Sequence, residues 1–226
     1  PSFESRVSLL PEAASSLAKK GINIYIETGA GERAFSSDEA YTKTGAVIKN
    51  RNEVLAGADI ILCINLLSNG EINTLNKKII IGVYQPLFNQ QIMESWAAAG
   101  ITSFSLDMLP RTTRAQSMDV LSSQANIAGY KAVLLAANNY SRYFPMFMTA
   151  AGSIPPAKVL ILGAGVAGLQ AIATARRLGA VVEVFDTRPA VKEEVMSLGA
   201  KFIEVEGAAD ASKAGGYAVE QSTEFM

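Results

Sequence analysis

The clearest candidate for chemistry in this sequence is a glycine-rich stretch between an apolar run and a helical run. The segment "KVLILGAGVAGLQAIATARRLG" carries Gly163-x-Gly165-x-x-Gly168 directly after the apolar residues 159–162. In a strand–turn–helix unit, the first glycine permits a tight turn and the second lets a pyrophosphate approach the backbone. The third lets the helix and the strand pack closely. The following helix would offer N–H groups and the positive end of its dipole to the phosphates, so this context predicts a dinucleotide-binding site.

An acidic residue follows this motif at the distance that ribose recognition requires. Asp186 ends a second apolar run, "AVVEVFD", roughly 20 residues after Gly168. A carboxylate there accepts hydrogen bonds from the adenosine ribose and repels a 2′-phosphate, so NAD(H) is favoured over NADP(H). Arg188 weakens this preference, because a nearby cation attracts such a phosphate. The cofactor-binding candidates in these two stretches are Gly163, Gly165, Val166, Ala167, Gly168, Asp186, Thr187 and Arg188.

Two further polar segments are candidates for a site. Residues 107–133, "DMLPRTTRAQSMDVLSSQANIAGYKAV", hold a cluster of polar side chains: Arg111, Arg114, Gln116, Asp119, Ser122, Ser123, Gln124 and Asn126. These residues either cap and pair in a loop that enters a helix, or they face a ligand, because interfaces between domains are preferred ligand sites. The segment "ETGAGE", residues 27–32, ends a predicted strand and either faces a cleft or forms a simple turn.

The elements that would position these residues follow one repeated pattern. A helical stretch ends in glycine and a β-branched run follows at once, as at Gly21, Gly45, Gly100, Gly179 and Gly199. Glycine suits the left-handed position that ends a helix, and the Val/Ile-rich runs are typical of strands buried on both faces. We predict five strands within residues 22–106 and three within residues 158–205. This alternation predicts an α/β fold with largely parallel sheets.

A long helical region, about residues 114–142, separates the two groups of strands. Its apolar residues recur at steps of three and four, which predicts one core-facing stripe. The stripe consists of Met118, Leu121, Ala125, Ala128, Ala132 and Leu135. We predict two domains, Rossmann-like or flavodoxin-like, that this helix links: an N-terminal α/β domain at 1–125 and a nucleotide-binding domain at 126–226. The second domain is expected to be truncated, because too few residues follow Pro156 for both three-stranded halves of such a sheet.

The composition excludes several classes of chemistry. The chain of 226 residues has no histidine and one cysteine, which excludes Ser-His-Asp and Cys-His catalysis and a cysteine-based zinc site. Lys and Arg number 20 against 21 Asp and Glu, so the net charge is −1. Proteins that bind nucleic acid normally carry a basic excess, and we therefore expect no nucleic-acid partner.

Taken together, these stretches resemble domain I, the NAD(H)-binding domain in the alpha subunit of proton-translocating nicotinamide nucleotide transhydrogenases. The resemblance covers essentially the whole chain, including "ESRVSLLPE" and "ETGAGE". It is strongest in "MLPRTTRAQSMDVLSSQANIAGYKAV", "MTAAGSIPPAKVLILGAGVAGLQAIATARRLGA" and "FDTRP". The same two-domain plan is shared with alanine dehydrogenases.

The resemblance implies roles for individual residues. Arg111, Gln116, Asp119 and Ser122 match the loop that holds the nicotinamide end of the cofactor, and Gln116 in the family reaches toward the nucleotide bound by the partner. Tyr217, in "GGYAVE", matches the tyrosine of a mobile loop that closes on NAD(H). The glycines of the motif and Asp186 match the family's NAD(H)-binding fingerprint.

The resemblance also implies an activity and its partners. The expected reaction is hydride transfer from NADH on this chain to NADP⁺ on domain III, coupled to proton movement through a transmembrane domain II. The family suggests a homodimer of this domain. It also implies a peripheral location on an energy-transducing membrane, either the cytoplasmic side of a bacterial inner membrane or the matrix side of a mitochondrial-type inner membrane.

Two other functions stay open beside this one. An amino-acid dehydrogenase of the alanine type needs a general base, and the family's lysine and histidine have no counterpart in "CINLLSNGEI" or "IGVYQPLFN". A non-catalytic NAD(H)-binding module would need only the nucleotide site. Direct hydride transfer between two nicotinamide rings needs no base, because the cofactors carry the reaction, and this agrees with a chain that lacks histidine.

Overall fold

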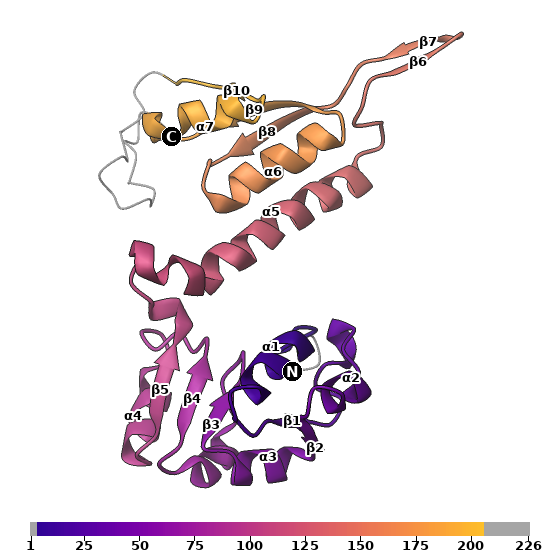
Figure 1. Ribbon diagram of the computed structural model, residues 1–226. Helices are drawn as coiled ribbons and strands as arrows, with labels where there is room; N and C mark the ends of the chain where they lie inside the picture. Colours follow the sequence, from indigo (N-terminus) through magenta and orange to yellow (C-terminus); the bar gives the residue numbers. More distant parts are fainter. Residues whose placement is uncertain (1–3, 206–226) are drawn as a thin grey trace. The chain divides into compact units, whose positions relative to one another are not determined.

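The computed structural model describes residues 4–205, and Figure 1 shows their helices and strands. The chain divides into two compact units between Asp119 and Val120, six residues before the predicted division after residue 125. Each unit contains parallel strands connected by helices, which confirms the predicted α/β fold class.

The first unit contains its strands where the β-branched runs predict them. Strand β1 (Tyr25–Glu27) pairs in parallel with β2 (Val47–Lys49). A second parallel sheet has the order β3 (Ile60–Leu62), β4 (Ile79–Gly82), β5 (Thr102–Ser105). Strands β3 and β4 are rich in Ile, but the prediction that the strands are buried on both faces was wrong for β3 and β5. Ile60 and Leu62 are exposed on either side of the buried Ile61, and β5 is largely exposed, because the described residues cover only one face of these strands.

Helices connect these strands, and local sequence signals fix where some of them begin. The α-helices of the unit are α1 (Pro11–Ala18), α2 (Asp38–Thr42), α3 (Arg51–Gly57) and α4 (Gln90–Ala98). The 3₁₀ helices are η1 (Glu32–Ala34), η2 (Asn69–Leu75), η3 (Leu106–Met108) and η4 (Thr113–Met118). Helix α3 starts at a capping box, in which the Asn50 side chain accepts from the Glu53 N–H and the Glu53 carboxylate accepts from the Asn50 N–H.

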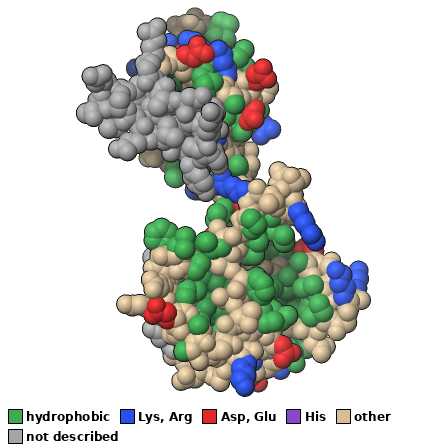
Figure 2. Space-filling model, turned by 90° about the vertical axis from the view of Figure 1, so that its left-hand side faces the viewer, with side chains coloured by type: hydrophobic (Ala, Val, Ile, Leu, Met, Phe, Trp, Pro, Cys, Tyr) green, Lys and Arg blue, Asp and Glu red, His purple; other side chains and the backbone are tan. Residues whose placement is uncertain are grey.

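Two buried apolar clusters stabilise the first unit. In one, Ile80 of β4 packs with Trp96 of α4, whose ring meets Tyr84 edge-on with 5.0 Å between centroids. In the other, Tyr41 packs near Ile26 and its hydroxyl donates to the Leu9 carbonyl at 2.7 Å. Apolar side chains also gather on one exposed face of this unit (Figure 2).

The second unit begins with the long helix and continues with the nucleotide-binding type of α/β pattern. In chain order its elements are α5 (Val120–Asn139), β6 (Phe147–Thr149), β7 (Gly152–Ile154), β8 (Lys158–Leu162), α6 (Val166–Arg177), β9 (Val181–Phe185), η5 (Pro189–Val191), α7 (Lys192–Ser197) and β10 (Lys201–Phe202). Strands β10, β9 and β8 form a parallel sheet in that order, and Leu162 lies opposite Phe185. Val182 and Val184 of β9 are buried in a core that includes Ile172 of α6.

Glycine ends helices in both units, as predicted. Gly179 after α6 has φ of 87° and Gly199 after α7 has φ of 77°. A residue with a Cβ is strained in this left-handed conformation, so glycine lets the chain reverse directly into β9 and β10. The three other glycines predicted to end helices also have positive φ.

The stripe predicted along the long helix was wrong. The residues of α5 that are buried are Gly129 and Val133, whereas Met118, Leu121 and Leu135 are about half exposed and Ala128 and Ala132 are also exposed. The face that packs against α6 is centred on Gly129, and nearby the Asn126 side-chain amide donates to Gln170 of α6. Where two helices pack closely, the contact needs the smallest residue, which is glycine. Counting large apolar residues along the helix therefore identifies a different face from the one that packs.

The antiparallel hairpin of β6 and β7 was not predicted from the sequence. Met148 pairs with Ser153 in it, and the Tyr143 and Phe147 rings stack with 5.0 Å between centroids. All six of its strand residues are exposed. Among residues 4–205, no helix has both the length and the apolar character that crossing a bilayer requires.

We expect Gly129→Ala to destabilise the second unit, although alanine is the better helix former by roughly 1 kcal/mol. A Cβ at Gly129 would lie 2.0 Å from the Ala167 carbonyl oxygen, which is backbone and cannot rotate away. The two helices must therefore separate, at a cost of about 1–3 kcal/mol. Urea denaturation followed by circular dichroism measures the loss.

The matched control is Gly70→Ala, because a Cβ at Gly70 meets no atom within 4 Å. This variant should unfold at nearly the same urea concentration as the wild type. Equal stability of the two alanine variants would show that α5 and α6 do not depend on this close approach.

Candidate functional site

The glycine-rich turn connects β8 to α6 with the geometry that its sequence predicts. Strand β8 ends at Leu162, and Gly163 turns the chain with φ of +94°. The Gly163 N–H donates to the Phe185 carbonyl at 2.7 Å, which extends the β8–β9 pairing by one step. Gly165 has extended backbone and precedes the first residue of α6, so the helix begins immediately after the turn.

The third glycine of this turn is closely packed, whereas the first two are not. A Cβ at Gly168 would lie 1.9 Å from the Gly163 carbonyl oxygen, so the third glycine is required where α6 crosses the turn. A Cβ at Gly163 or at Gly165 would meet no atom of the described residues within 4 Å. The turn is therefore closely packed on the helix side and leaves open space beside the first two glycines.

The N-terminus of α6 has the donors that an anion needs. The first turn of the helix includes Val166 and Ala167, whose N–H groups have no partner within a helix. In the described part of the chain, no side chain caps this end. The helix is 12 residues long, so its dipole places partial positive charge beside the open space at Gly165. This arrangement suits a phosphate or pyrophosphate group.

Asp186 joins the glycine turn to the end of β9. Its Oδ2 accepts from the Ala164 N–H at 2.7 Å and from the Arg188 Nη2 at 2.8 Å. Its Oδ1 accepts from the backbone N–H of Arg188 at 2.8 Å and from the Arg188 Nε at 2.9 Å. The carboxylate thus fixes the turn and at the same time forms a two-pronged ion pair with the guanidinium.

The hydrogen bonds keep Asp186 ionised despite its burial. The side chain of Asp186 is 6% exposed and that of Arg188 is 19% exposed. Burial would raise the pKa of Asp186, but hydrogen bonds from the Arg188 side chain and from the N–H groups of Ala164 and Arg188 lower it to about 2. A negative charge therefore lies beside the phosphate-type site at neutral pH, which is the arrangement that recognises ribose hydroxyls.

The structure brings together the cofactor-binding candidates that precede residue 189. The glycine turn, Val166, Ala167, Asp186, Thr187 and Arg188 lie at the adjoining ends of β8 and β9 and at the start of α6. Tyr217, the remaining candidate, lies outside the described residues. The ion pair between Asp186 and Arg188 was not predicted, although their spacing of two residues at the end of a strand is the signal that could have indicated it.

Three of the four candidates for the nicotinamide end, Arg111, Gln116 and Asp119, belong to the end of the first unit, and Ser122 belongs to the start of the second. Arg111 precedes η4, Gln116 lies within it, and Asp119 follows its last residue. Ser122 lies in the first turn of α5. The Thr112 side chain accepts from the Ala115 N–H at 3.4 Å, so part of this segment does cap a helix. Arg111 and Gln116 are exposed, whereas Asp119 and Ser122 are half-buried.

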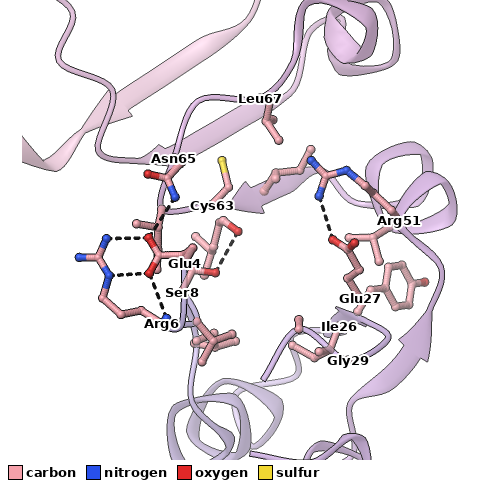
Figure 3. A pocket seen from close by; sticks show the side chains of 18 of the residues that line it. Glu4, Arg6, Ser8, Ile26, Glu27, Gly29, Arg51, Cys63, Asn65 and Leu67 are labelled. Carbon is pink, nitrogen blue, oxygen red and sulfur yellow. Dashed lines mark hydrogen bonds and ion pairs between the residues drawn. The ribbon is translucent and has the colours of Figure 1, made fainter. Parts of the chain in front are cut away.

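The first unit contains a separate cavity of about 470 Å³, shown in Figure 3. It lies at the carboxyl ends of β1 and β3, and residues 4–9 form another part of its wall. Glu27, Gly29 and Glu32 of the "ETGAGE" segment line it, so this segment faces a cavity. Sequence reasoning missed the contribution of residues 4–9, because they reach the cavity from far away in the chain.

Internal ion pairs neutralise much of the charge in this cavity. The Arg6 guanidinium donates to both oxygens of Glu4, at 2.8 and 2.7 Å, and the Asn65 amide donates to Glu4 at 3.0 Å. The hydrogen bonds from Arg6 outweigh burial and lower the pKa of Glu4 to about 2. On another wall Arg51 bridges Glu27 and Glu71, at 2.9 and 2.5 Å.

The titratable groups that line the cavity bear on whether it could transfer a proton. Its described lining residues include neither lysine nor histidine, and its carboxylates Glu4 and Glu27 are held by arginines. Among residues 4–205, no cluster of His, Cys, Asp or Glu could hold a metal ion. Two of the three carboxylates in the described lining, those of Glu4 and Glu27, are therefore already paired, and the third belongs to Glu32.

Known proteins resemble this chain in both sequence and structure. The chain is 46% identical over 226 residues to NAD(P) transhydrogenase subunit alpha from Cereibacter sphaeroides, an alignment that covers 98% of this chain and 43% of that subunit. The crystal structure of transhydrogenase from Sinorhizobium meliloti matches with a TM-score of 0.85 at 49% identity, covering 89% of this chain and 60% of that one. An L-alanine dehydrogenase matches with a TM-score of 0.78 at 23% identity, covering 91% and 58%.

The chain thus spans less than two thirds of each of these proteins. The similarity to transhydrogenases inferred from the sequence is confirmed, and the alanine dehydrogenase shares the fold. Residues 1–128 match the alanine dehydrogenase/PNT N-terminal domain, and residues 132–224 match the corresponding C-terminal domain. The chain therefore belongs to the alanine dehydrogenase/PNT family.

Proposed function

We propose that this chain is the NAD(H)-binding component of a proton-translocating NAD(P) transhydrogenase. In this proposal it binds NADH and passes the hydride to NADP⁺ held by a partner domain. The observation that carries the proposal is the nucleotide site of the second unit. There an open glycine turn, the start of α6, which no described side chain caps, and the ionised Asp186 meet at the adjoining ends of β8 and β9.

The residues of this site fit a dinucleotide with a free ribose 2′-hydroxyl. The start of α6 stabilises the pyrophosphate through its N–H groups and dipole. Asp186 accepts hydrogen bonds from the adenosine ribose, and its negative charge opposes a 2′-phosphate. The site therefore favours NAD(H), and the partner domain supplies the site for NADP(H).

The absence of histidine from the chain suits this reaction. The bound nicotinamide supplies the hydride, so no side chain has to accept a proton from an alcohol or an amine. The protein has to hold the reacting ring still and exclude misaligned approaches, because productive transfer needs the reacting atoms roughly 3–3.5 Å apart. We assign this positioning to Arg111, Gln116, Asp119 and Ser122, and closure of the site over the cofactor to Tyr217.

The partners follow from the same proposal. A domain III that carries NADP(H) accepts the hydride, and a transmembrane domain II couples the transfer to proton translocation. The chain would function as a homodimer that is peripheral to an energy-transducing membrane. The membrane is either a bacterial inner membrane, with the chain on its cytoplasmic side, or a mitochondrial-type inner membrane, with the chain on its matrix side.

An amino-acid dehydrogenase is the second candidate, because an L-alanine dehydrogenase shares the fold. The cavity of the first unit argues against it, since its lining contains no lysine or histidine in the described chain and Glu4 already occupies Arg6. A non-catalytic NAD(H) sensor is the third candidate. It would bind NADH but would not transfer hydride.

Titration of the chain with NADH, followed by fluorescence and repeated with NADPH, tests the nucleotide site. Mixing the NADH-loaded chain with a recombinant, NADP⁺-loaded domain III then tests transfer. Selective NADH binding with rapid transfer would support the transhydrogenase. Binding without transfer would favour a sensor, and oxidation of alanine by NAD⁺ would favour the dehydrogenase.

Replacing Gln116 by asparagine should slow hydride transfer far more than it weakens NADH binding. The shorter side chain withdraws the amide by about one methylene, and misplacement on the order of 1 Å can slow a reaction roughly 100-fold. Single-turnover transfer to the NADP⁺-loaded partner measures the rate, and NADH titration measures the affinity.

Gln90→Asn is the control for this substitution, because Gln90 lies on α4 and donates to Glu94. It should leave both the transfer rate and the affinity unchanged. A Gln116→Asn variant that transfers hydride at the wild-type rate would remove Gln116 from the mechanism.

Replacing Asp186 by alanine should weaken NADH binding and relax the discrimination against NADPH. A hydrogen bond to a charged group is worth about 1.5–3 kcal/mol, so the Kd for NADH should rise about tenfold or more. The affinity for NADPH should change less, because the charge that opposes its 2′-phosphate has been removed.

The matched control is Glu183→Ala, which removes a carboxylate from the same strand, where it pairs with Lys201 at 3.4 Å. Its selectivity should equal that of the wild type. If Asp186→Ala kept the wild-type ratio of the two dissociation constants, Asp186 would have no contact with the ribose.

A further inference from the structure

The hydrogen bonds of Asp186 have a consequence for cofactor binding. A carboxylate offers about four lone-pair positions to donors. Four donors already surround Asp186: the N–H groups of Ala164 and Arg188, and the Nε and Nη2 of the Arg188 side chain. All four bonds measure between 2.7 and 2.9 Å. Two ribose hydroxyls therefore cannot bind this carboxylate unless donors leave it.

Only one pair of these donors can leave without disturbing the fold. The Ala164 N–H belongs to the turn between β8 and α6, and the Arg188 N–H belongs to the backbone that follows β9. Both are fixed by the elements around them. The guanidinium is the end of a flexible side chain that is 19% exposed, so it can rotate toward solvent while the backbone stays in place.

We propose that the Arg188 side chain occupies the acceptor positions that the adenosine ribose needs, so that this arginine sets both the affinity for NADH and the discrimination against NADPH. This inference rests on the proposed function, because it assumes that NADH binds at the glycine turn. Breaking the ion pair lowers the net affinity for NADH. The displaced guanidinium then lies within one side-chain length of the ribose, where its charge partly offsets the repulsion between Asp186 and a 2′-phosphate.

The other charges near this ion pair do not take its place. Glu194 of α7 also acts on the Arg188 guanidinium, and it can attract the side chain once Asp186 is released. Lys192 pairs with Glu204 at 2.5 Å and Lys201 pairs with Glu183 at 3.4 Å. The side chain that hydrogen-bonds to Asp186 and carries a positive charge is that of Arg188.

Arg188→Gln tests the proposal, with NADH and NADPH titrated separately at one fixed ionic strength. The variant should bind NADH about threefold to tenfold more tightly, because the ribose no longer displaces an ion pair. The ratio of the Kd for NADPH to the Kd for NADH should rise about tenfold, because the compensating cation is gone. An unchanged or smaller ratio would overturn the proposal, as would an equal loss of affinity for both cofactors.

Two further variants keep the test decisive. Arg188→Lys retains the charge and replaces the fork by a single ammonium, which fills fewer positions on the carboxylate. It should bind NADH more tightly than the wild type even if Arg188→Gln proves unstable, and equal or weaker binding would contradict the proposal. Lys201→Gln removes a positive charge elsewhere on the same sheet and should leave the ratio unchanged. If the ratio of the two dissociation constants rose as much in Lys201→Gln as in Arg188→Gln, the change would come from the net charge of the chain and the proposal would be contradicted.

The outcomes also separate this proposal from the proposed function. A wild-type chain that binds neither cofactor would contradict the nucleotide site itself and both proposals with it. If the wild-type chain binds NADH selectively and the Arg188 variants keep the same ratio of the Kd for NADPH to the Kd for NADH, the role of Arg188 is contradicted and the nucleotide site is not.

Discussion

The close approach of α6 to the turn after β8 is the constraint on which the nucleotide site depends. The helix crosses the turn at Gly168, where a Cβ would lie 1.9 Å from the Gly163 carbonyl oxygen. Asp186 holds the same turn from the neighbouring strand through the Ala164 N–H. Because these two contacts fix where the helix starts, they also fix the donors and the dipole that a phosphate group would meet.

The two units differ in how their charges are arranged. In the second unit, a buried carboxylate and its arginine lie beside an open helix N-terminus, so binding can exchange one partner for another. In the cavity of the first unit, Glu4 and Arg6 are bound to each other and Asn65 adds a further bond to Glu4. The Arg6 side chain is 46% exposed and that of Glu4 is 18% exposed, so water screens this pair and it contributes little to stability. Its guanidinium is already bound to a carboxylate, which leaves less positive charge for an anionic ligand.

Sequence periodicity predicted the strands well and the helix packing badly, for a physical reason. The Ile- and Val-rich runs of β4 and β9 each have a glycine near one end, Gly82 and Gly179, so their type follows from local preference. The packing face of α5 depends on Gly129, which contributes no apolar surface and is selected because the Ala167 backbone comes so close. The hairpin of β6 and β7 consists of exposed residues, and its strands carry no buried alternation to reveal them.

The sequence by itself determined the order of the candidate nucleotide-site residues, because the strand, glycine turn, helix and terminal Asp186 follow one another within a short stretch of the chain. The tertiary structure decided which partners Asp186 has, since its carboxylate meets the Ala164 N–H only when β8 and β9 pair. It also decided the cavity of the first unit, where Glu4 meets Asn65 across 61 positions of sequence. The spacing of residues in the sequence predicts interactions between residues that are close along the chain. The pairing of charges that are distant in the chain depends on the register of the strands and on burial.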